Sequence, residues 1–303
     1  LHLLSRRQRQ MCIRDSINGT TRVCGLIGNP VGHSISPVIH NSLAQLMDMN
    51  MVYTTFKVEK GDVVTAVNGA YALNILGLNV TVPHKQAVME SLVDIDPLAK
   101  AIGAVNTLVR TDKGYKGYNT DILGLERELI DEGVVLLGSR CVILGAGGAA
   151  RAIAFLCAKS GAKEIYVLNR TKEKAYDIAK AVNDYFGKEC IKPMLISEYD
   201  KLEADDYVVI QTTSVGLYPN VDDVVIDDEA FYKKVKVGVD IIYNPSETRF
   251  MKMCKNAGKP ACNGLKMLLY QGVAAYELWN DVSVTKEQAD KVYNKMKEEL
   301  GIE

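Results

Sequence analysis

The amino-acid sequence predicts an α/β protein with two domains, and three observations support this. From Arg22 onward, short β-rich runs alternate with helical stretches, which is typical of layered α/β domains with a mostly parallel sheet. The runs at 206–214 and 235–243 are almost continuously apolar, as expected of parallel strands that are buried on both faces. The length of 303 residues also suits two domains of ordinary size better than one.

The first series of elements starts with a strand at 23–28. The other elements expected there are a helix at 36–47, strands at 52–58 and 78–82, and a β-hairpin formed by 104–109 and 115–118. Pro83 suits the first turn of a helix that follows the 78–82 strand, because the fixed φ and missing N–H of proline are tolerated there.

A second series starts near Leu123. Its expected strands lie at 140–147, 164–170, 206–214 and 235–243. Three helices are expected between them: one that ends near Glu132, one that ends near Ser160 and one that spans about 172–185. The chain ends in two helices, at 264–279 and 285–300. Thr285 and Gln288 have the spacing of a capping box at the start of the last helix.

Composition excludes several classes of protein. The 36 basic and 37 acidic residues give a net charge of -1, whereas binding to nucleic acids or to a membrane surface needs a basic excess. No apolar run reaches the roughly 18 residues that cross a bilayer. The seven cysteines show no disulfide pattern, so we expect free thiols and a reducing, cytoplasmic location. The four histidines show no metal-ligand spacing, so we expect no metal site. Residues 1–16 are expected to be a disordered extension or an artefact.

A glycine-rich turn follows the expected strand at 140–147. Residues 145–150 read GAGGAA, which is the G-x-G-x-x-A form of the dinucleotide-binding turn. Its first glycines allow a tight turn and a close approach of the backbone to a pyrophosphate at the start of the next helix. Many strand–helix turns are rich in glycine, so this motif alone leaves the function open.

The end of the next strand bears on which dinucleotide would bind. Asn169, Arg170 and Thr171 stand there, about two dozen residues after Gly145, and Lys174 follows one turn later. An acidic residue at this place would bind the ribose 2′-hydroxyl of NAD, whereas an arginine suits the 2′-phosphate of NADP. NADP is therefore favoured over NAD. The alternative is that these cations only form the solvated start of a helix.

Two serines stand at a strand-to-helix junction in the first series. The hydroxyls of Ser34 and Ser36 can both donate to one carboxylate near the positive end of a helix. Alternatively, either serine only caps the helix, as serines often do.

A lysine and an aspartate are candidates for proton transfer. Lys85 is expected one turn into a helix beyond a strand end, Asn106 ends another short strand, and Asp121 lies near the presumed domain junction. A lysine beside an aspartate can relay the proton that accompanies hydride transfer to a ketone. Alternatively, Lys85 is only a surface lysine and Asp121 only the N-cap of a helix. His84 is expected to be a packed or exposed neighbour of Lys85 rather than a catalyst.

Nine segments of the chain, taken in order, resemble the shikimate dehydrogenase family. The resemblance covers essentially everything from about Arg22 to the last helix, and residues 1–16 have no counterpart in it. The segments are GNPVGHSISP, NVTVPHK, AVNTL, YNTD, GAGGAAR, NRT, TTSVGLYP, DIIYNP and GLKMLLYQG.

The resemblance implies reversible NADPH-dependent reduction of 3-dehydroshikimate to shikimate, on the route to chorismate and the aromatic amino acids. It also implies a discontinuous substrate-binding domain and an inserted Rossmann-type domain that face each other across a cleft. The domains would then comprise 17–121, 122–263 for the NADP-binding part, and 264–303 returning to the first domain. A monomer or homodimer is expected.

The resemblance further implies roles for particular residues. Lys85 would be the acid–base group paired with Asp121. The substrate carboxylate would be bound by Ser34, Ser36 and Tyr243, and the ring hydroxyls by Thr81, Asn106, Asp121 and Gln271. The pyrophosphate would be bound by Gly145, Ala146, Gly147, Gly148 and Ala149, and the adenosine phosphate by Asn169, Arg170, Thr171 and Lys174. Thr213, Ser214, Ile241, Gly264 and Met267 would lie along the ribose and nicotinamide.

Two positions depart from the family pattern. Lys174 stands where many members have a second arginine, and Gln211 stands where asparagine is common. Two other functions stay open: a quinate/shikimate dehydrogenase that uses NAD, and a catalytically silent NADP-binding regulator. Asn169 and Arg170 argue against the first, and the presence of both Lys85 and Asp121 argues against the second.

Overall fold

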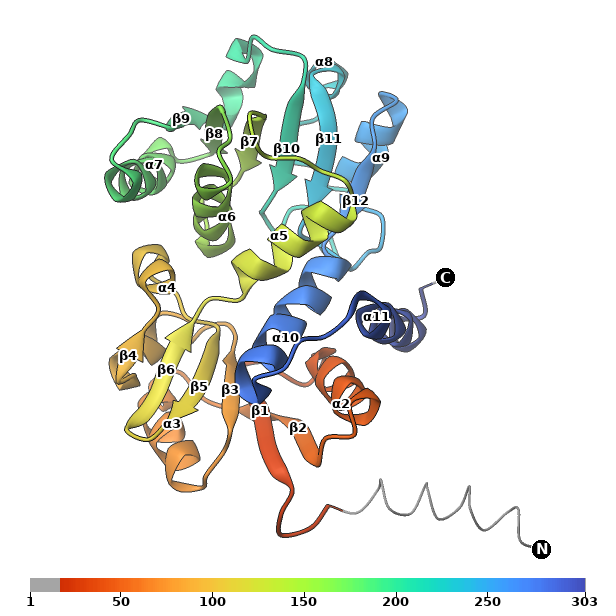
Figure 1. The fold of residues 1–303 in the computed structure, drawn as a ribbon. Coiled ribbons are helices and arrows are strands. Elements are labelled where there is room, and N and C mark those ends of the chain that lie inside the picture. Colours follow the sequence, from red (N-terminus) through yellow and green to blue (C-terminus); the bar gives the residue numbers. More distant parts are fainter. Residues whose placement is uncertain (1–16, 303) are drawn as a thin grey trace, which may run out of the picture. The chain divides into compact units, whose positions relative to one another are not determined.

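The computed structural model describes residues 17–302, which form two compact units that each contain one six-stranded sheet (Figure 1). The first unit comprises 17–99, 104–119 and 272–302, and the second comprises 100–103 and 120–271. The expectation for residues 1–16 lies outside the described part of the chain.

The sheet of the first unit is mixed, with strand order β2-β1-β3-β5-β6-β4. The strands β2, β1 and β3 are parallel, β5 runs antiparallel to both β3 and β6, and β4 runs parallel to β6. The strands are β1 (Arg22–Gly28), β2 (Met51–Lys57), β3 (Gly77–Val80), β4 (Asp94–Ile95), β5 (Thr107–Thr111) and β6 (Gly114–Tyr118). The helices that begin in this unit are α2 (Ser36–Leu46), α3 (Val63–Ala72), η1 (Ala87–Ser91), α4 (Pro97–Ile102) and α11 (Lys286–Leu300).

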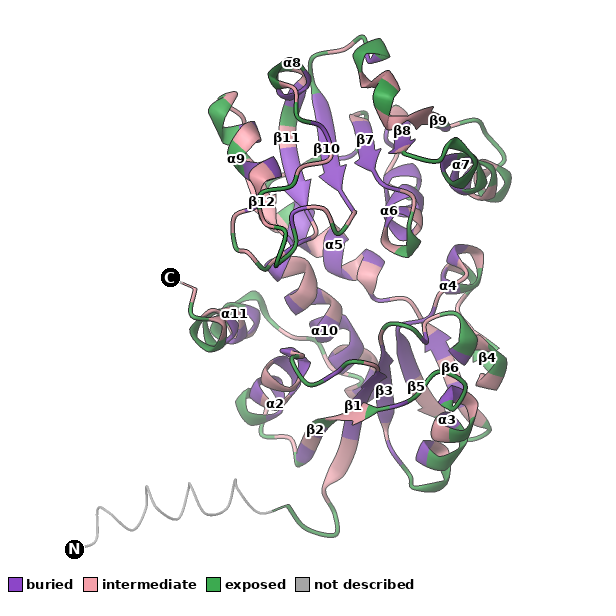
Figure 2. Ribbon diagram, turned by 180° about the vertical axis from the view of Figure 1, so that it is seen from behind, coloured by how far each residue is buried: buried purple, intermediate pink, exposed green. Residues whose placement is uncertain are grey.

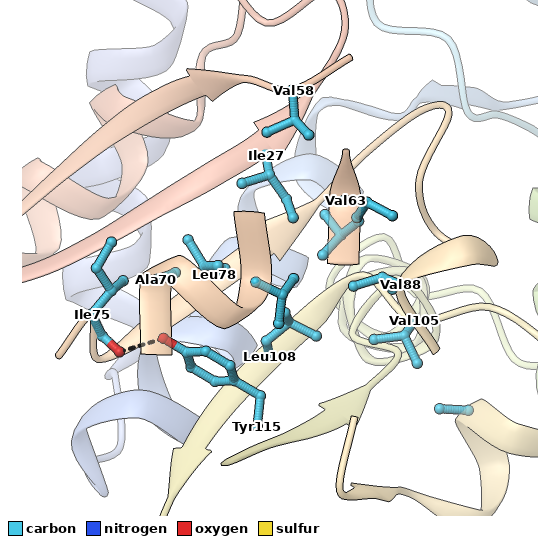
Figure 3. Packing of buried hydrophobic residues seen from close by; sticks show 13 residues of the cluster. Ile27, Val58, Val63, Ala70, Ile75, Leu78, Val88, Val105, Leu108 and Tyr115 are labelled. Carbon is cyan, nitrogen blue, oxygen red and sulfur yellow. Dashed lines mark hydrogen bonds between the residues drawn. The ribbon is translucent and has the colours of Figure 1, made fainter. Parts of the chain in front are cut away.

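A buried apolar cluster joins this sheet to α3 and η1 (Figure 3). Leu78 and Leu108 come from adjacent strands, and Val63 and Ala70 come from α3. The Tyr115 hydroxyl, which is buried beside them, donates to the carbonyl of Ile75 at 2.6 Å. Its polar end is therefore satisfied inside the core.

The sheet of the second unit is entirely parallel, with strand order β12-β11-β10-β7-β8-β9. Its two central strands, β10 and β7, are buried over nearly their whole length, which is why they consist of apolar runs (Figure 2). The strands are β7 (Arg140–Leu144), β8 (Glu164–Asn169), β9 (Ile191–Leu195), β10 (Tyr207–Gln211), β11 (Val235–Asp240) and β12 (Ala261–Asn263). The helices are α5 (Asp121–Asp131), α6 (Gly148–Lys159), α7 (Lys172–Phe186), η2 (Ile196–Lys201), α8 (Glu229–Lys233), α9 (Arg249–Asn256) and α10 (Leu265–Asn280), which continues into the first unit.

The predicted alternation of strands and helices, the hairpin of β5 and β6 and the capping box of α11 are confirmed. The Thr285 hydroxyl accepts from Gln288 N, and the Gln288 side chain accepts from Thr285 N. The helix expected to begin at Pro83 was wrong, because the chain makes turns there and enters the 3-10 helix η1 only at Ala87.

Two absences hold for the described residues. No helix between residues 17 and 302 is long and apolar enough to span a bilayer. Within the same range, no group of three or more His, Cys, Asp or Glu side chains is arranged to hold a metal ion. Six cysteines in this range are free thiols.

Glu128 on α5 is a buried carboxyl group, only 1% exposed. Burial raises its pKa to about 8, and the backbone amide of Met267 opposes part of this shift. The folded protein therefore holds this proton more tightly than the unfolded chain does. The contribution of Glu128 to stability is full below its ordinary pKa of 4.5 and is lost as the pH rises to about 8.

We therefore expect Glu128→Gln to make the free energy of unfolding less dependent on pH. Between pH 5 and pH 9 the variant should lose about 3 kcal/mol less stability than the wild-type protein, because it has no buried carboxyl to ionise. Urea unfolding at both pH values measures this difference. Glu126→Gln on the same helix is the control, since Glu126 is only half-buried and forms an ion pair with Lys159. Equal pH dependence in Glu128→Gln and wild type would contradict the assignment.

Candidate functional site

The turn between β7 and α6 can only be built with glycine at its first position. Gly145 has φ +110°, and a Cβ there would lie 2.7 Å from Thr213 Cγ2 and 2.8 Å from Thr212 Oγ1. At Gly147 and Gly148 a Cβ would meet nothing within 4 Å, so these residues face open space. Gly147 is the N-cap of α6 and no side chain caps this helix end. Its first amides are thus available to an anion.

A pocket of about 510 Å³ opens beside this turn. Nine of the residues predicted to bind the cofactor line it: Gly145, Ala146, Gly147, Asn169, Arg170, Thr171, Lys174, Thr213 and Ser214. Gly148, Ala149, Ile241, Gly264 and Met267 are not among its lining residues. The glycine turn, the end of β8 and the loop after β10 are therefore brought together as the sequence motifs implied.

The end of β8 contributes the positive charge of this pocket. Arg170 follows the strand and Lys174 lies in the first turn of α7, and both side chains are exposed. Asn169 Nδ2 donates to the Thr171 carbonyl at 2.9 Å, which fixes the turn between strand and helix. The pocket lining contains no acidic residue. Such a lining fits a phosphate-bearing dinucleotide better than one with a bare 2′-hydroxyl.

Sequence reasoning missed the apolar side of this pocket. Ile196, Val224 and Val225 line it together with Thr212 and Val215. Ile196 directly follows β9, so its place after a strand end was a usable signal. Val224 and Val225 lie in a loop without such a signal, and only the folded chain brings them here.

Gly264 and Ile241 lie together at the carboxyl ends of β12 and β11. A Cβ at Gly264 would be 2.3 Å from the Ile241 carbonyl oxygen, and Gly264 N donates to Ile242 O at 3.1 Å. Glycine is required here because the two backbones touch. Met267 follows near the start of α10.

The first unit collects its candidate residues at one edge of its sheet. Ser34 and Ser36 follow β1, while Thr81 and Lys85 follow the parallel strand β3. Asn106 directly precedes β5, so the prediction that it ends a strand was wrong. Because β5 runs antiparallel to β3, its start meets the end of β3, and Val80 N donates to Asn106 O at 2.8 Å.

The loops after β1 and β3 touch each other. A Cβ at Gly28 would lie 2.2 Å from Thr81 Cγ2, and Asn29 N donates to Val82 O at 3.0 Å. The absence of a side chain at Gly28 therefore allows Thr81 to approach the loop that bears the serines.

The serines lie at the start of α2, where the N-cap residue is Ile35 and makes no side-chain cap. Ser34 is half-buried and its Oγ accepts from Ser36 N at 3.2 Å, while Ser36 is buried. Ser34 thus does contact the first helical amide, in line with part of the capping alternative. The pair still presents two hydroxyls at a helix N-terminus, which suits an anion.

Lys85 lies in a turn before η1, so the prediction that it lies one turn into a helix was wrong. Its carbonyl accepts from Val105 N at 2.8 Å, which ties this turn to the residue before Asn106. Its neighbour His84 is buried, with Nε2 2.8 Å from the Val58 carbonyl, and is therefore a packed residue.

A chain of buried hydrogen bonds runs beneath this edge. Tyr53 Oη donates to Asn79 Oδ1 at 2.8 Å, Asn79 Nδ2 donates to Thr107 Oγ1 at 3.1 Å, and Thr107 Oγ1 donates to Asn106 Oδ1 at 3.0 Å. The last bond fixes the orientation of the Asn106 amide, whose Oδ1 accepts from Thr107. His40 stacks on Tyr53 at 4.1 Å, and burial lowers its pKa to about 3, so it is neutral at ordinary pH.

The remaining candidates belong to the second unit. Asp121 is the first residue of α5, whose N-cap is Thr120 and not Asp121. Gln271 on α10 donates to the Leu268 carbonyl at 2.8 Å. Burial raises the pKa of Tyr243, which follows β11 and is half-buried, so its hydroxyl stays protonated.

Comparison with known proteins identifies the family of this chain. Residues 26–108 match the shikimate dehydrogenase substrate binding domain, and residues 129–248 match the shikimate/quinate 5-dehydrogenase family. A shikimate dehydrogenase (NADP+) from Desulforamulus reducens is 43% identical over 265 residues, covering 87% of this chain and 91% of that protein.

Two solved structures are also similar. A shikimate dehydrogenase in complex with NADP+ has a TM-score of 0.85 and 38% identity, covering 94% of this chain and 97% of that one. A shikimate 5-dehydrogenase from Listeria monocytogenes, in complex with shikimate and NAD, has a TM-score of 0.84 and 30% identity, covering 94% and 98%. The chain therefore belongs to the shikimate dehydrogenase family.

Proposed function

We propose that this protein is an NADP-dependent shikimate dehydrogenase, which reversibly reduces 3-dehydroshikimate to shikimate in the pathway to chorismate and the aromatic amino acids. The pocket beside the glycine turn carries the proposal, because it joins an uncapped helix N-terminus to Arg170 and Lys174 without any acidic lining residue. The similarity to NADP+ shikimate dehydrogenases over most of the chain supports the same activity.

In this proposal the second unit binds the cofactor in three parts. The residues from Gly145 to Ala149 would bind the pyrophosphate through their backbone amides, and the glycines leave room for it. Arg170, Lys174, Asn169 and Thr171 hold the 2′-phosphate, and the apolar residues Ile196, Val224 and Val225 accept the adenine ring. Thr213, Ser214, Ile241, Gly264 and Met267 lie along the ribose and nicotinamide.

Substrate binding uses neutral donors and hydrogen-bonding side chains. Ser34 and Ser36 donate to the substrate carboxylate with help from the protonated Tyr243. Thr81, Asn106, Asp121 and Gln271 bind the ring hydroxyls. Asn106 suits this role because the buried chain from Tyr53 fixes the orientation of its amide.

The chemistry needs one proton besides the hydride that bound NADPH supplies. Lys85 donates this proton to the carbonyl oxygen, and in the reverse reaction it takes the proton back. The family resemblance pairs Asp121 with the lysine and with an adjacent ring hydroxyl, and this pairing would orient both groups for the reaction. The protein contributes orientation, while the cofactor contributes the redox chemistry.

We further propose that the functional domains are 17–121 with 264–303, and 122–263, and that the enzyme acts in the cytoplasm as a monomer or homodimer. The free cysteines are compatible with a reducing compartment.

The direct test is the absorbance of reduced nicotinamide, with shikimate or quinate combined with NADP or NAD. Rapid reduction only with shikimate and NADP is the expected result. Comparable rates with quinate or NAD would instead support a quinate/shikimate dehydrogenase. No reaction in any mixture, from protein that binds NADPH, would point to a silent regulator.

Arg170→Ala should weaken NADPH binding by roughly tenfold to a hundredfold and change NADH binding little, because a charged hydrogen bond to the 2′-phosphate is lost. Fluorescence titration with each nucleotide measures both dissociation constants. Lys172→Ala is a matched control, since Lys172 starts the same helix but does not line the pocket. Equal weakening of both nucleotides by Arg170→Ala would refute the phosphate assignment.

Lys85→Ala should lower turnover by roughly 10²- to 10⁴-fold, because the proton donor is removed, and should leave the KM for shikimate within a few-fold. Steady-state kinetics separate the two parameters. Lys113→Ala, at the exposed turn between β5 and β6, serves as the control. Normal turnover at saturation with a large rise in KM would contradict the role of Lys85.

A further inference from the structure

Gln211 is a fully buried amide at the carboxyl end of β10, and it does not itself line the dinucleotide pocket. A buried amide must satisfy its donors and its acceptor inside the protein, so its contacts show which groups it holds.

The Gln211 side chain bonds the backbone of the loop that follows its own strand. Oε1 accepts from Thr213 N at 2.5 Å, and Nε2 lies 3.2 Å from both the Thr213 and the Val215 carbonyl oxygens. Both the N–H and the C=O of Thr213 are thus held by one side chain. This loop has little freedom to move as long as the amide stays in place.

Asp240 determines which way this amide points. It is buried at the end of the adjacent strand β11, and its Oδ1 lies 3.5 Å from Gln211 Nε2. Asp240 is itself fixed, since Oδ2 accepts from the Thr248 hydroxyl at 2.7 Å and Oδ1 accepts from Ile242 N at 3.0 Å. The carboxylate accepts only, so it favours the NH₂ side of Gln211 and turns Oε1 toward Thr213 N.

The loop held in this way forms a wall of the dinucleotide pocket. Thr213 and Val215 line the pocket, and the Thr213 methyl group lies against the glycine turn, close to where a Cβ of Gly145 would stand. A shift of Thr213 by a few tenths of an ångström would either crowd Gly145 or widen the pocket.

We propose that Gln211, oriented by Asp240, is a positioning residue that fixes the Thr213–Val215 wall against the glycine turn and so sets the affinity for the dinucleotide. This inference rests on the proposed cofactor site. Because Gln211 contacts the loop after β10 and not the end of β8, its loss weakens NADPH and NADH by the same factor, unlike the loss of Arg170.

The test compares variants of β10 by fluorescence titration with NADPH and with NADH. Gln211→Met keeps the length of the side chain but removes its hydrogen bonds, so both dissociation constants should rise roughly tenfold. Gln211→Asn keeps an amide that can still accept from the N–H two residues onward, so it should stay within about threefold of wild type. Val209→Ala removes core packing from the same strand and should lower the melting temperature without weakening either nucleotide.

Gln211→Leu replaces Gln211→Met if the latter does not fold, because a branched apolar side chain also removes the hydrogen bonds of the amide without burying a charge. The positioning role would be overturned by any of three results. The variant without the amide binds both nucleotides as tightly as wild type, or it binds only NADPH more weakly, or Val209→Ala weakens nucleotide binding as much as that variant does. A wild-type protein that binds neither nucleotide would overturn the proposed cofactor site itself.

Discussion

Parallel strands deliver their carboxyl ends to one edge of a sheet, and the placement of nearly every candidate side chain depends on this constraint. In the second unit, Gly145, Arg170 and Gln211 stand at the ends of β7, β8 and β10, which are neighbours in the sheet. In the first unit, β1 and β3 supply two loops to such an edge. The antiparallel strand β5 adds Asn106 there by starting where its neighbour ends.

The two edges offer different groups to a negatively charged ligand. The pocket of the second unit combines the uncapped amides of α6 with full positive charges from exposed cations. The edge of the first unit relies on hydroxyls and amides whose orientation is fixed by buried partners, with the neutral His40 packed on Tyr53. A flexible dinucleotide phosphate tolerates mobile cations, whereas a small ring with several hydroxyls needs fixed donors.

Much of this arrangement could be predicted from the sequence because its signals are local. The glycine turn, the basic end of β8 and the capping box of α11 each lie within a few consecutive residues, and the structure has them where expected. The turn at Lys85 was mistaken for a helix because the pattern after Pro83 does not distinguish a turn and a 3-10 helix from an α-helix. Val224 and Val225 lie in a loop without a local signal, so their place in the pocket could not be predicted. The contact between Gln211 and Asp240 could not be predicted either, because it depends on β10 and β11 becoming neighbours.

The packing of α11 against α2 has a consequence for truncation of the chain. Ala289, Val292 and Met296 are the buried residues of α11, and α2 is the helix that begins at Ser36. The last turns of the chain thus support the helix whose first residue belongs to the substrate edge. Deleting α11 would therefore uncover the face of α2 that it packs against, although the two helices are far apart in the sequence.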